Sequence, residues 1–503
     1  MSSIDNLTNY DVDETPSILE VRSDKVTPIS SDVSNRRYIF RLEPQGVLDS
    51  NTLLQFKLTR AAAAANDELR VNCFNGSLGS VKRVIFRIGD FVLNDTSSVA
   101  AWSTITNLAS RRRIDLNRYD SFTLGNQFHT TTSLADDETH GQFQIDSSLS
   151  GFNFGARTAN SLKLVDEEED CYKYGIPLGK LIPAIKGREI PLFLFDQYRI
   201  NIEVEFNAPS FYMNSDVATG TAAAADGDVA ISQVELLVDY IIYPSSVLEA
   251  QRSQTQKEGG LVLDFYNVVN VERQLVVAAG AVAAVASNAD YLTNGVLQAT
   301  KTTKEFRIGQ ENREIHQVMM LKKQQGKVAV GGAADNRASL MLEQRVDGLA
   351  SESIMWTING VDVYPERVKS TASQYDQLYY SLGYRDLQVE RPMFFGDANS
   401  ISSGLTTSQS GLQCTYKPIG YDAKTSIGSG QILGTGTLLG KYPLVLKYEC
   451  TPASSLTTYG AGDTGNSVCT RQDGIYDVDF IITTSRRAVV QSTPKGMMVS
   501  ISV

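Results

Sequence analysis

The stretch Val84-Ile-Phe-Arg-Ile-Gly-Asp-Phe-Val-Leu93 decides the fold, because it aligns without gaps on Ile354-Met-Trp-Thr-Ile-Asn-Gly-Val-Asp-Val363, 270 residues later. Each copy reads as an apolar strand, a two-residue turn and a second strand. The turn dipeptides, Gly89-Asp90 and Asn359-Gly360, tolerate the positive φ angles of tight hairpins. The two segments therefore predict the same hairpin twice, and with it an internal duplication of the chain.

A short helix is expected after each hairpin, packed against its own half of the molecule. The residues with helical spacing are Val99, Trp102, Ile105 and Leu108 in the first copy, and Tyr375, Leu378, Tyr379 and Leu382 in the second. In the first copy, Asp95 to Ser98 offers several possible N-caps. Each set forms one apolar stripe that a helix can bury.

Strict alternation of apolar and polar residues predicts β-strands elsewhere. It is clearest in Ile200–Phe206, Val234–Ile242 and Tyr476–Ile482, and less clean in Leu53–Leu58. Long helical periodicity is rare. The chain therefore reads as all-β, with long polar loops.

The later strands also match between the two halves. Pro191-Leu-Phe-Leu with Tyr198–Phe206 resembles Pro443–Tyr448, and Val234–Tyr243 resembles Tyr476–Thr483. The duplication predicts three parts: an N-terminal arm (1–35), a first half (36–245) and a second half with a C-terminal tail (246–503). The halves join near Pro244-Ser-Ser and Gln251–Gly260. Each has room for about eight strands, and eight strands in two facing sheets make a jelly roll. The expected fold is two consecutive eight-stranded jelly rolls, a double jelly roll, with short helices in loops.

Several segments are expected to lie outside the cores. The polar stretch 1–35 shows no sustained apolar period and suggests an extended arm. Stretches rich in Ala, Gly, Ser and Thr suggest surface loops that contact partners: Ala61–Ala65, Thr219–Asp228, Ala278–Asn288, Gly326–Ala338 and Asp397–Gly440.

Composition excludes several classes of protein. A formal net charge of −11 argues against broad nucleic-acid binding, and no feature suggests recognition of a specific nucleic-acid sequence. The longest apolar run, Leu275–Ala286, is too short for the roughly 20 residues of a membrane helix. The start of the chain does not resemble a secretory signal. The 5 cysteines are scattered and lack a CxxC pair, which favours a reducing compartment without disulfides.

The sequence lacks a catalytic inventory. Its 3 histidines, His129, His140 and His316, are too far apart to pair on a helix as metal ligands. Phosphate-binding glycine loops, nucleophile elbows and zinc-binding HExxH motifs are absent. We therefore predict that the protein is not an enzyme, and assign no catalytic, cofactor-binding or metal residues and no cofactor.

Charged clusters and tyrosines are the candidate interaction sites. The acidic runs Asp166-Glu-Glu-Glu-Asp170 and Asp136-Asp-Glu-Thr-His140 could bind a cation, but such runs are usually solvated. Basic clusters could face DNA or an acidic neighbour, or could be solvated: Arg111–Arg113 with Arg118, Arg36-Arg37 and Arg486-Arg487. The 22 tyrosines, Tyr375, Tyr379 and Tyr380 among them, suit interfaces, although core packing explains most of them.

Three features together resemble the double jelly-roll major capsid proteins of icosahedral double-stranded DNA viruses. They are the arm, the hairpin Gly79–Asp90 with its helix, and Ile190-Pro-Leu with the strand after it. The polinton-like virus and virophage branch is the most similar. The resemblance covers most of 36–503, and it rests on element order and short motifs.

The resemblance implies a structural role. Three chains would form a homotrimer whose six jelly rolls make a pseudo-hexagonal capsomer, and capsomers would tile an icosahedral shell around double-stranded DNA. Partners would be neighbouring capsomers, penton proteins and minor capsid proteins, whereas contact with an internal membrane or the genome stays open. The protein would assemble inside the host cell and reside in the virion.

Two other functions remain open from the sequence. One is a β-rich receptor-binding or carbohydrate-binding viral protein, such as a spike or fibre component, whose loop aromatics would bind the ligand. The other is a β-rich carbohydrate-active enzyme that uses paired carboxylates.

Overall fold

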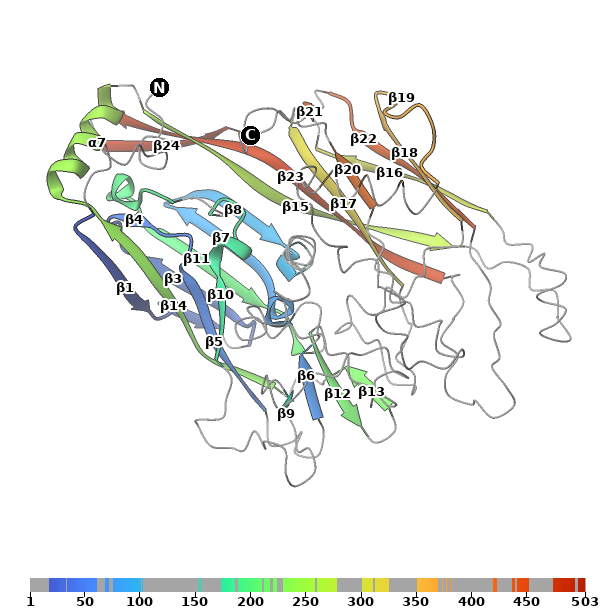
Figure 1. The fold of residues 1–503 in the computed structure, drawn as a ribbon, viewed down its shortest axis with the longest axis horizontal. Coiled ribbons are helices and arrows are strands. Elements are labelled where there is room, and N and C mark those ends of the chain that lie inside the picture. Colours follow the sequence, from blue (N-terminus) through green and yellow to red (C-terminus); the bar gives the residue numbers. More distant parts are fainter. Residues whose placement is uncertain are drawn as a thin grey trace, which may run out of the picture.

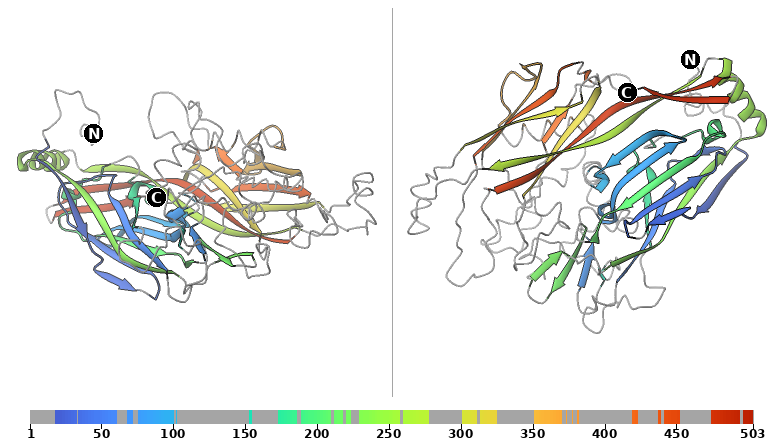
Figure 2. Two further views of the ribbon diagram at one scale, coloured as in Figure 1. Left: turned by 60° about the horizontal axis from the view of Figure 1, so that its bottom comes forward. Right: turned by 180° about the vertical axis from the view of Figure 1, so that it is seen from behind.

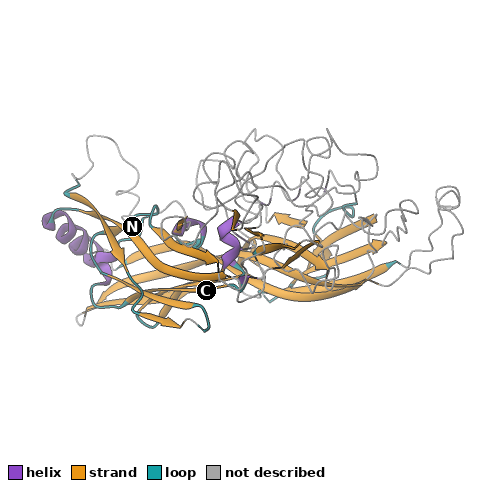
Figure 3. Ribbon diagram, turned by 90° about the horizontal axis from the view of Figure 1, so that it is seen from below, coloured by secondary structure: helices purple, strands orange, loops and turns teal. Residues whose placement is uncertain are grey.

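The computed structural model describes residues 18–32, 34–60, 68–71, 76–100, 102, 153–154, 173–185, 189–209, 212–217, 220–223, 229–257, 260–277, 301–310, 313–324, 351–369, 373, 377, 381, 419–422, 437–438, 441–451, 474–493 and 496–502. Most of this part of the chain is β-strand (Figure 3). The strands form two sandwiches of antiparallel sheets and one small extra sheet (Figure 1).

The first sandwich pairs two sheets, named here after their central strands. The β14 sheet contains, in spatial order, β1 (Glu20–Val26), β14 (Val229–Ile242), β5 (Leu53–Arg60) and β10 (Lys173–Pro177), with β4 (Val47–Leu48) on β14. The β11 sheet contains β2 (Ser30–Asp32), β3 (Arg37–Leu42), β11 (Ile200–Phe206), β7 (Val81–Ile88) and β8 (Phe91–Ser97).

The second sandwich has the same plan. The β23 sheet contains β15 (Leu261–Val277), β23 (Gly474–Thr493), β17 (Glu314–Gln324) and β20 (Ile419–Asp422), with β21 (Thr437–Leu438) on β17 and β24 (Gly496–Ser502) on β23. The β22 sheet contains β16 (Thr302–Gly309), β22 (Leu444–Thr451), β18 (Ser351–Ile358) and β19 (Val361–Asp362).

The remaining elements are smaller. A separate sheet holds β13 (Gly220–Ala223), β12 (Met213–Val217), β6 (Glu68–Val71) and β9 (Asn153–Phe154). The helices are α7 (Ser245–Lys257) and the 3-10 turns η2 (Gly76–Ser80), η4 (Leu178–Lys180) and η5 (Leu192–Phe195).

The two sandwiches share one strand order, which confirms the predicted duplication. The order β1-β14-β5-β10 in the first sandwich corresponds to β15-β23-β17-β20 in the second. Likewise, β3-β11-β7-β8 corresponds to β16-β22-β18-β19. Eight strands in two facing four-stranded layers therefore occur twice along the chain, and the all-β double jelly-roll prediction is correct.

Both predicted hairpins are present. In the first, β7 and β8 pair through the turn at Gly89, where φ is +60°. In the second, β18 and β19 pair through Asn359 and Gly360, with φ values of +53° and +73°. Positive φ at both central residues is what a type I′ hairpin turn requires, and Asn-Gly supplies it with little strain.

Alternating burial explains the strands that the sequence predicted. Along β11, every second side chain from Ile200 to Phe206 is buried and those between are half-buried. Along β23, the buried members include Tyr476, Val478, Phe480 and Ile482. In β5, where the alternation is less clean, Leu54, Phe56 and Leu58 are fully buried and Leu53 is half-buried.

Each sandwich has its own hydrophobic core. The first is rich in aromatic contacts, with the Phe56 ring 5.7 Å from Tyr174 and 5.1 Å from Phe206. The second surrounds Trp356, whose ring centroid lies 5.1 Å from that of Tyr421. These cores account for many of the tyrosines, whereas Tyr375, Tyr379 and Tyr380 lie outside the described residues.

A long ribbon of strands ties the sandwiches together. From its pairing with the second sandwich, the β15–β23 pair continues along the first sandwich towards α7 (Figure 2). There, Phe265 of β15 and Ala488 of β23 belong to the first core. The terminal strand β24 pairs with the same end of β23, from Arg487 to Thr493. The first jelly roll is therefore completed by strands of the second half.

The region around 244–260, where the halves were expected to join, contains the helix α7, in which Arg252 donates a 2.7 Å hydrogen bond to the Phe193 carbonyl. Two expectations about loops need correction. The loop predicted at Thr219–Asp228 contains β13. The loop predicted at Asp397–Gly440 contains β20 and β21, and β20 buries Tyr421 against Trp356. Short strands flanked by Gly, Ser and Thr carry too little apolar pattern to be recognised.

The described part of the segment 1–35 contains two strands, β1 and β2. Within it, β1 pairs with β14 along seven residues as an edge strand. Its residues are exposed or half-buried, and only Val26 packs against the first core. Strand β1 is joined to the first sandwich by backbone hydrogen bonds.

The helix predicted after the first hairpin begins at Val99, where the Trp102 amide donates a 3.2 Å hydrogen bond to the Ser98 carbonyl. Ile105 and Leu108, and the whole apolar stripe of the second predicted helix, lie outside the described residues. Asp95, expected among the possible caps, is instead part of β8.

Candidate interaction surfaces and the junction of the sandwiches

Several clusters singled out in the sequence fall outside the described part of the chain. These are Asp136–His140, Asp166–Asp170, Arg111–Arg113 and Arg118. Within the described residues, no three His, Cys, Asp or Glu side chains come together as a metal site would require. Of the cysteines, Cys450 is a buried free thiol whose pKa is raised by burial.

The Arg36-Arg37 cluster belongs to a ladder of ion pairs on the outer face of the β11 sheet. The Arg37 guanidinium lies 2.6 Å from Glu203, and this hydrogen bond raises the pKa of Arg37. Nearby, Arg83 bonds both oxygens of Asp95, at 2.8 and 2.6 Å. Carboxylates already compensate these cations, so this face is not a free basic patch.

The β22 sheet has an ion pair at a position that matches one ion pair of the β11 sheet. In the first sandwich, Glu205 of β11 binds Lys82 at 2.6 Å. At the matching position of β22, Glu449 lies 2.8 Å from Lys301 and 2.9 Å from Arg367. The hydrogen bond from Lys301 is the main cause of the lowered pKa of Glu449. Sequence reasoning missed this pair, although both strands had been aligned.

The Arg486-Arg487 cluster is split by the alternation of β23. Arg487 is exposed, whereas the Nε of Arg486 is buried with no hydrogen-bond partner among the described residues. Burial lowers the pKa of Arg486, and the neighbouring charge of Arg313 lowers it further. Arg486 is therefore not a solvated basic residue.

A buried polar seam joins the two sandwiches where β8 meets β15. The Asn94 amide donates to the Asn267 side-chain oxygen at 3.1 Å and to the Tyr266 carbonyl at 3.3 Å. The Thr96 hydroxyl donates to the Asn94 oxygen at 2.7 Å. Asn94, Thr96 and Asn267 are at most 1% exposed, so these bonds replace water entirely.

The seam continues three residues further along β15, at Asn270. The Asn270 amide donates to the Ser98 hydroxyl at 2.7 Å and to Asp479 at 3.3 Å. Directional bonds of this kind fix the register between two packed elements more tightly than apolar contacts do. The seam therefore sets how one jelly roll sits on the other.

His316 lies close to this junction. It is 7% exposed, its ring packs edge-on to Tyr266 at 4.9 Å, and Glu314 lies 3.9 Å from its Nε2. Neither ring nitrogen has a hydrogen-bond partner among the described residues. Burial lowers the pKa of His316 below its usual 6.5, and Glu314 opposes this only in part.

Exposed apolar side chains gather near the N-terminal edge of the first sandwich. Ile18, Leu19, Val21 and Ile29 are 50 to 66% exposed. Ile18, Leu19 and Val21 lie on or beside β1, an edge strand whose outer side carries no paired strand among the described residues, and Ile29 directly precedes β2. An open edge flanked by apolar groups favours contact with another chain.

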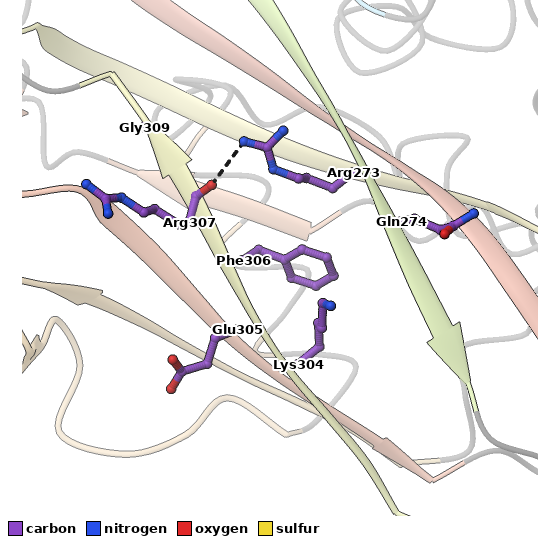
Figure 4. A pocket seen from close by; sticks show the side chains of 7 residues that line it. All are labelled: Arg273, Gln274, Lys304, Glu305, Phe306, Arg307 and Gly309. Atoms are coloured by element: carbon purple, nitrogen blue, oxygen red, sulfur yellow. Dashed lines mark hydrogen bonds between the residues drawn. The ribbon is translucent and has the colours of Figure 1, made fainter.

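A surface depression lies between β15 and β16, at the side of the second sandwich. Its volume is about 460 Å³, and Figure 4 shows its lining residues, Arg273, Gln274, Lys304, Glu305, Phe306, Arg307 and Gly309. Arg273 spans the opening, because its guanidinium donates to the Arg307 carbonyl at 3.5 Å and to the Glu272 carbonyl at 2.9 Å. The buried Phe306 side chain comes from the second core.

Among the described helices, none is both long and apolar enough to span a membrane.

Comparison with known sequences gives no relative. No family model matches the chain, and a search of curated proteins also gives no match.

Comparison with solved structures identifies the fold. The PBCV-1 virus capsid, in a quasi-atomic model, gives a TM-score of 0.57 at 12% identity, with 97% of each chain covered. A PBCV-1 protein crystal structure fitted into a reconstruction of the virophage Sputnik gives 0.54 at 12% identity, covering 97% of this chain and 98% of that one. The Sputnik virophage structure gives 0.50 at 13% identity, covering 97% and 89%. The chain therefore shares the double jelly-roll fold of these capsid structures along almost its whole length.

Proposed function

We propose that this chain is a major capsid protein: its homotrimer forms a pseudo-hexagonal capsomer, and capsomers tile an icosahedral shell around double-stranded DNA. The observation that carries the proposal is the duplicated sandwich, with one strand order used twice in a single chain. Two similar but unequal jelly rolls let three chains approximate sixfold symmetry, with which units can tile the faces of a shell. The shared fold of the PBCV-1 and Sputnik capsid structures supports the same role.

In this proposal, the chain acts by forming interfaces with other copies and does not catalyse a reaction. The described surfaces agree with this, because they offer an open strand edge, ion-pair ladders and a basic depression. In the proposed division of the chain, residues 36–245 and 246–503 supply the two jelly rolls and 1–35 the arm. Neighbouring capsomers, penton proteins and minor capsid proteins would be the partners, and the virion the location, after assembly in the reducing interior of the host cell.

The oligomeric state tests this proposal. Light scattering on the purified chain is expected to give three times 55.0 kDa, with six-lobed particles on a negatively stained grid. A monomer of 55.0 kDa under every condition tried, with no assembly, would overturn it. Saturable binding of that monomer to a glycan array would then favour a receptor-binding or carbohydrate-binding protein.

A further inference from the structure

The basic depression lies at a position where the two sandwiches carry different residues on matched edge strands. The hairpins set the alignment, since Ile88 pairs with Ile200 in the first sandwich and Ile358 pairs with Leu444 in the second. Strands β11 and β22 therefore correspond with Ile200 matched to Leu444. Four residues further along, Val204 of β11 corresponds to Tyr448 of β22.

The neighbouring edge strand supplies the difference. Tyr38 of β3 pairs with Val204, whereas Lys304 of β16 pairs with Tyr448, so Lys304 stands where the first sandwich has Tyr38. Tyr38 is 7% exposed and packs edge-on against Phe206 at 5.6 Å, which closes the side of the first sandwich. Lys304 is exposed and leaves the second sandwich open there.

The opening carries an excess of positively charged side chains. Its lining has three cations, Arg273, Lys304 and Arg307, and one carboxylate, Glu305. Within the described part of the chain, no carboxylate lies at ion-pair distance from Arg273 or Lys304. Arg273 donates to two neutral carbonyls, which orient the guanidinium without neutralising it. On a chain of net charge −11, such a surface differs from its surroundings.

We propose that this depression binds a carboxylate-rich segment of a second copy of the chain, and that the segment is Asp166-Glu-Glu-Glu-Asp170. Five consecutive carboxylates are the densest anionic feature of the sequence. A guanidinium held in a fixed plane accepts a carboxylate in a two-pronged contact, and Lys304 adds a second, movable charge. The inference rests on the proposed self-association only in requiring that two copies meet.

The first test needs no assembly. The receptor is the full chain with its own run neutralised by Asp166→Asn, Glu167→Gln, Glu168→Gln, Glu169→Gln and Asp170→Asn, so that it cannot compete. A labelled peptide of residues 161–170 is expected to bind saturably in fluorescence anisotropy and to weaken as salt increases. Adding Arg273→Glu and Lys304→Glu to the receptor should weaken binding about tenfold. The matched control, Lys257→Glu with Lys369→Glu, makes the same charge change on exposed lysines elsewhere and should leave binding unchanged.

The second test asks whether the contact forms between copies. One variant carries the neutralised run and an intact depression, and the other carries an intact run with Arg273→Glu and Lys304→Glu. Mixed at low salt, they should associate more strongly in light scattering than either variant alone. Circular dichroism checks that each is folded.

Three results would overturn the inference. One is no saturable binding of the peptide, and another is binding that the control substitutions weaken equally. The third is binding of a short single-stranded DNA, with the same dependence on Arg273 and Lys304, in place of the peptide. Each result leaves the trimer measurement, and so the capsid proposal, unaffected.

Discussion

Gly89 and Gly360 occupy matched hairpin turns, and they differ in what surrounds them. Both have positive φ, at +60° and +73°. A Cβ at Gly89 would lie 2.7 Å from the Tyr198 ring, whereas nothing lies within 4 Å of a Cβ at Gly360. Gly360→Ala should therefore cost only the conformational strain, about 1–2 kcal/mol. Gly89→Ala should cost more, since the Tyr198 side chain must also move.

Urea denaturation of the two variants measures this difference. Equal losses of stability would show that the ring of Tyr198 moves away freely, and that only φ matters at this turn. Tyr198→Ala in the Gly89→Ala background provides the control, because it removes the obstructing ring.

His316 should make the protein less stable in mild acid. Its pKa in the folded chain is lowered by burial, so the unfolded chain binds the proton first. Stability is complete above the ordinary pKa of 6.5 and falls as the pH drops below it, by at most about 1.4 kcal/mol per pH unit. Thermal unfolding of the wild type and of His316→Gln, measured from pH 8 to 5, tests the effect. We expect the fall in stability with decreasing pH to be smaller in His316→Gln. Parallel curves would contradict it.

At the scale of elements, the polar seam between β8 and β15 should hold the sandwiches in register. Asn94→Ala leaves the buried Asn267 oxygen without its donor and should cost about 1–3 kcal/mol. The double variant with Asn267→Ala should cost less than the sum of the single changes. Additive losses in urea unfolding would mean that the two amides are not coupled.

The sequence predicted the elements whose local signals agree with their place in the fold. The two hairpins combine apolar strands with turn dipeptides, and Ile200–Phe206 alternates through a half-buried sheet. The misses have physical causes. Helix α7 is mostly polar, and its apolar contacts with the first core come from the adjacent residues Val247 and Leu248, with Arg252 over Phe193, so it lacks an apolar stripe along its length. Strand β20 has four residues, too few to show a period.

The candidate surfaces were harder to foresee than the fold. Arg36-Arg37 and Arg486-Arg487 look alike in sequence, yet a carboxylate compensates Arg37 while Arg486 turns inward. The basic depression gathers residues from two strands about 30 positions apart, and none stands out locally. Partners across strands depend on register, which local composition does not specify.

For the whole molecule, the ribbon of β15 and β23 makes the first jelly roll dependent on the second half. Phe265 and Ala488 are 5% and 0% exposed within the first core. A fragment ending at residue 257 lacks both and should not unfold cooperatively. In the full chain, Ala488→Asp should cost several kcal/mol by burying a charge, whereas the control Gln491→Asp, at an exposed position on the same strand, should be near neutral.

Hydrogen exchange in the β11 sheet distinguishes the outcomes. Faster exchange there in Ala488→Asp, with the β22 sheet unchanged, is the expected result. A fragment of residues 1–257 with a sharp unfolding transition would contradict the dependence.

The ribbon of β15 and β23 also affects when the first jelly roll can finish folding during synthesis. The wall of the first jelly roll is supplied partly by β23, which is synthesised after the other strands of that sandwich. Until then, the earlier half emerges without its closing strands, and contacts this distant in sequence form slowly. A chain interrupted before β23 therefore has neither sandwich finished, because β23 is a strand of the second and contributes Ala488 to the core of the first.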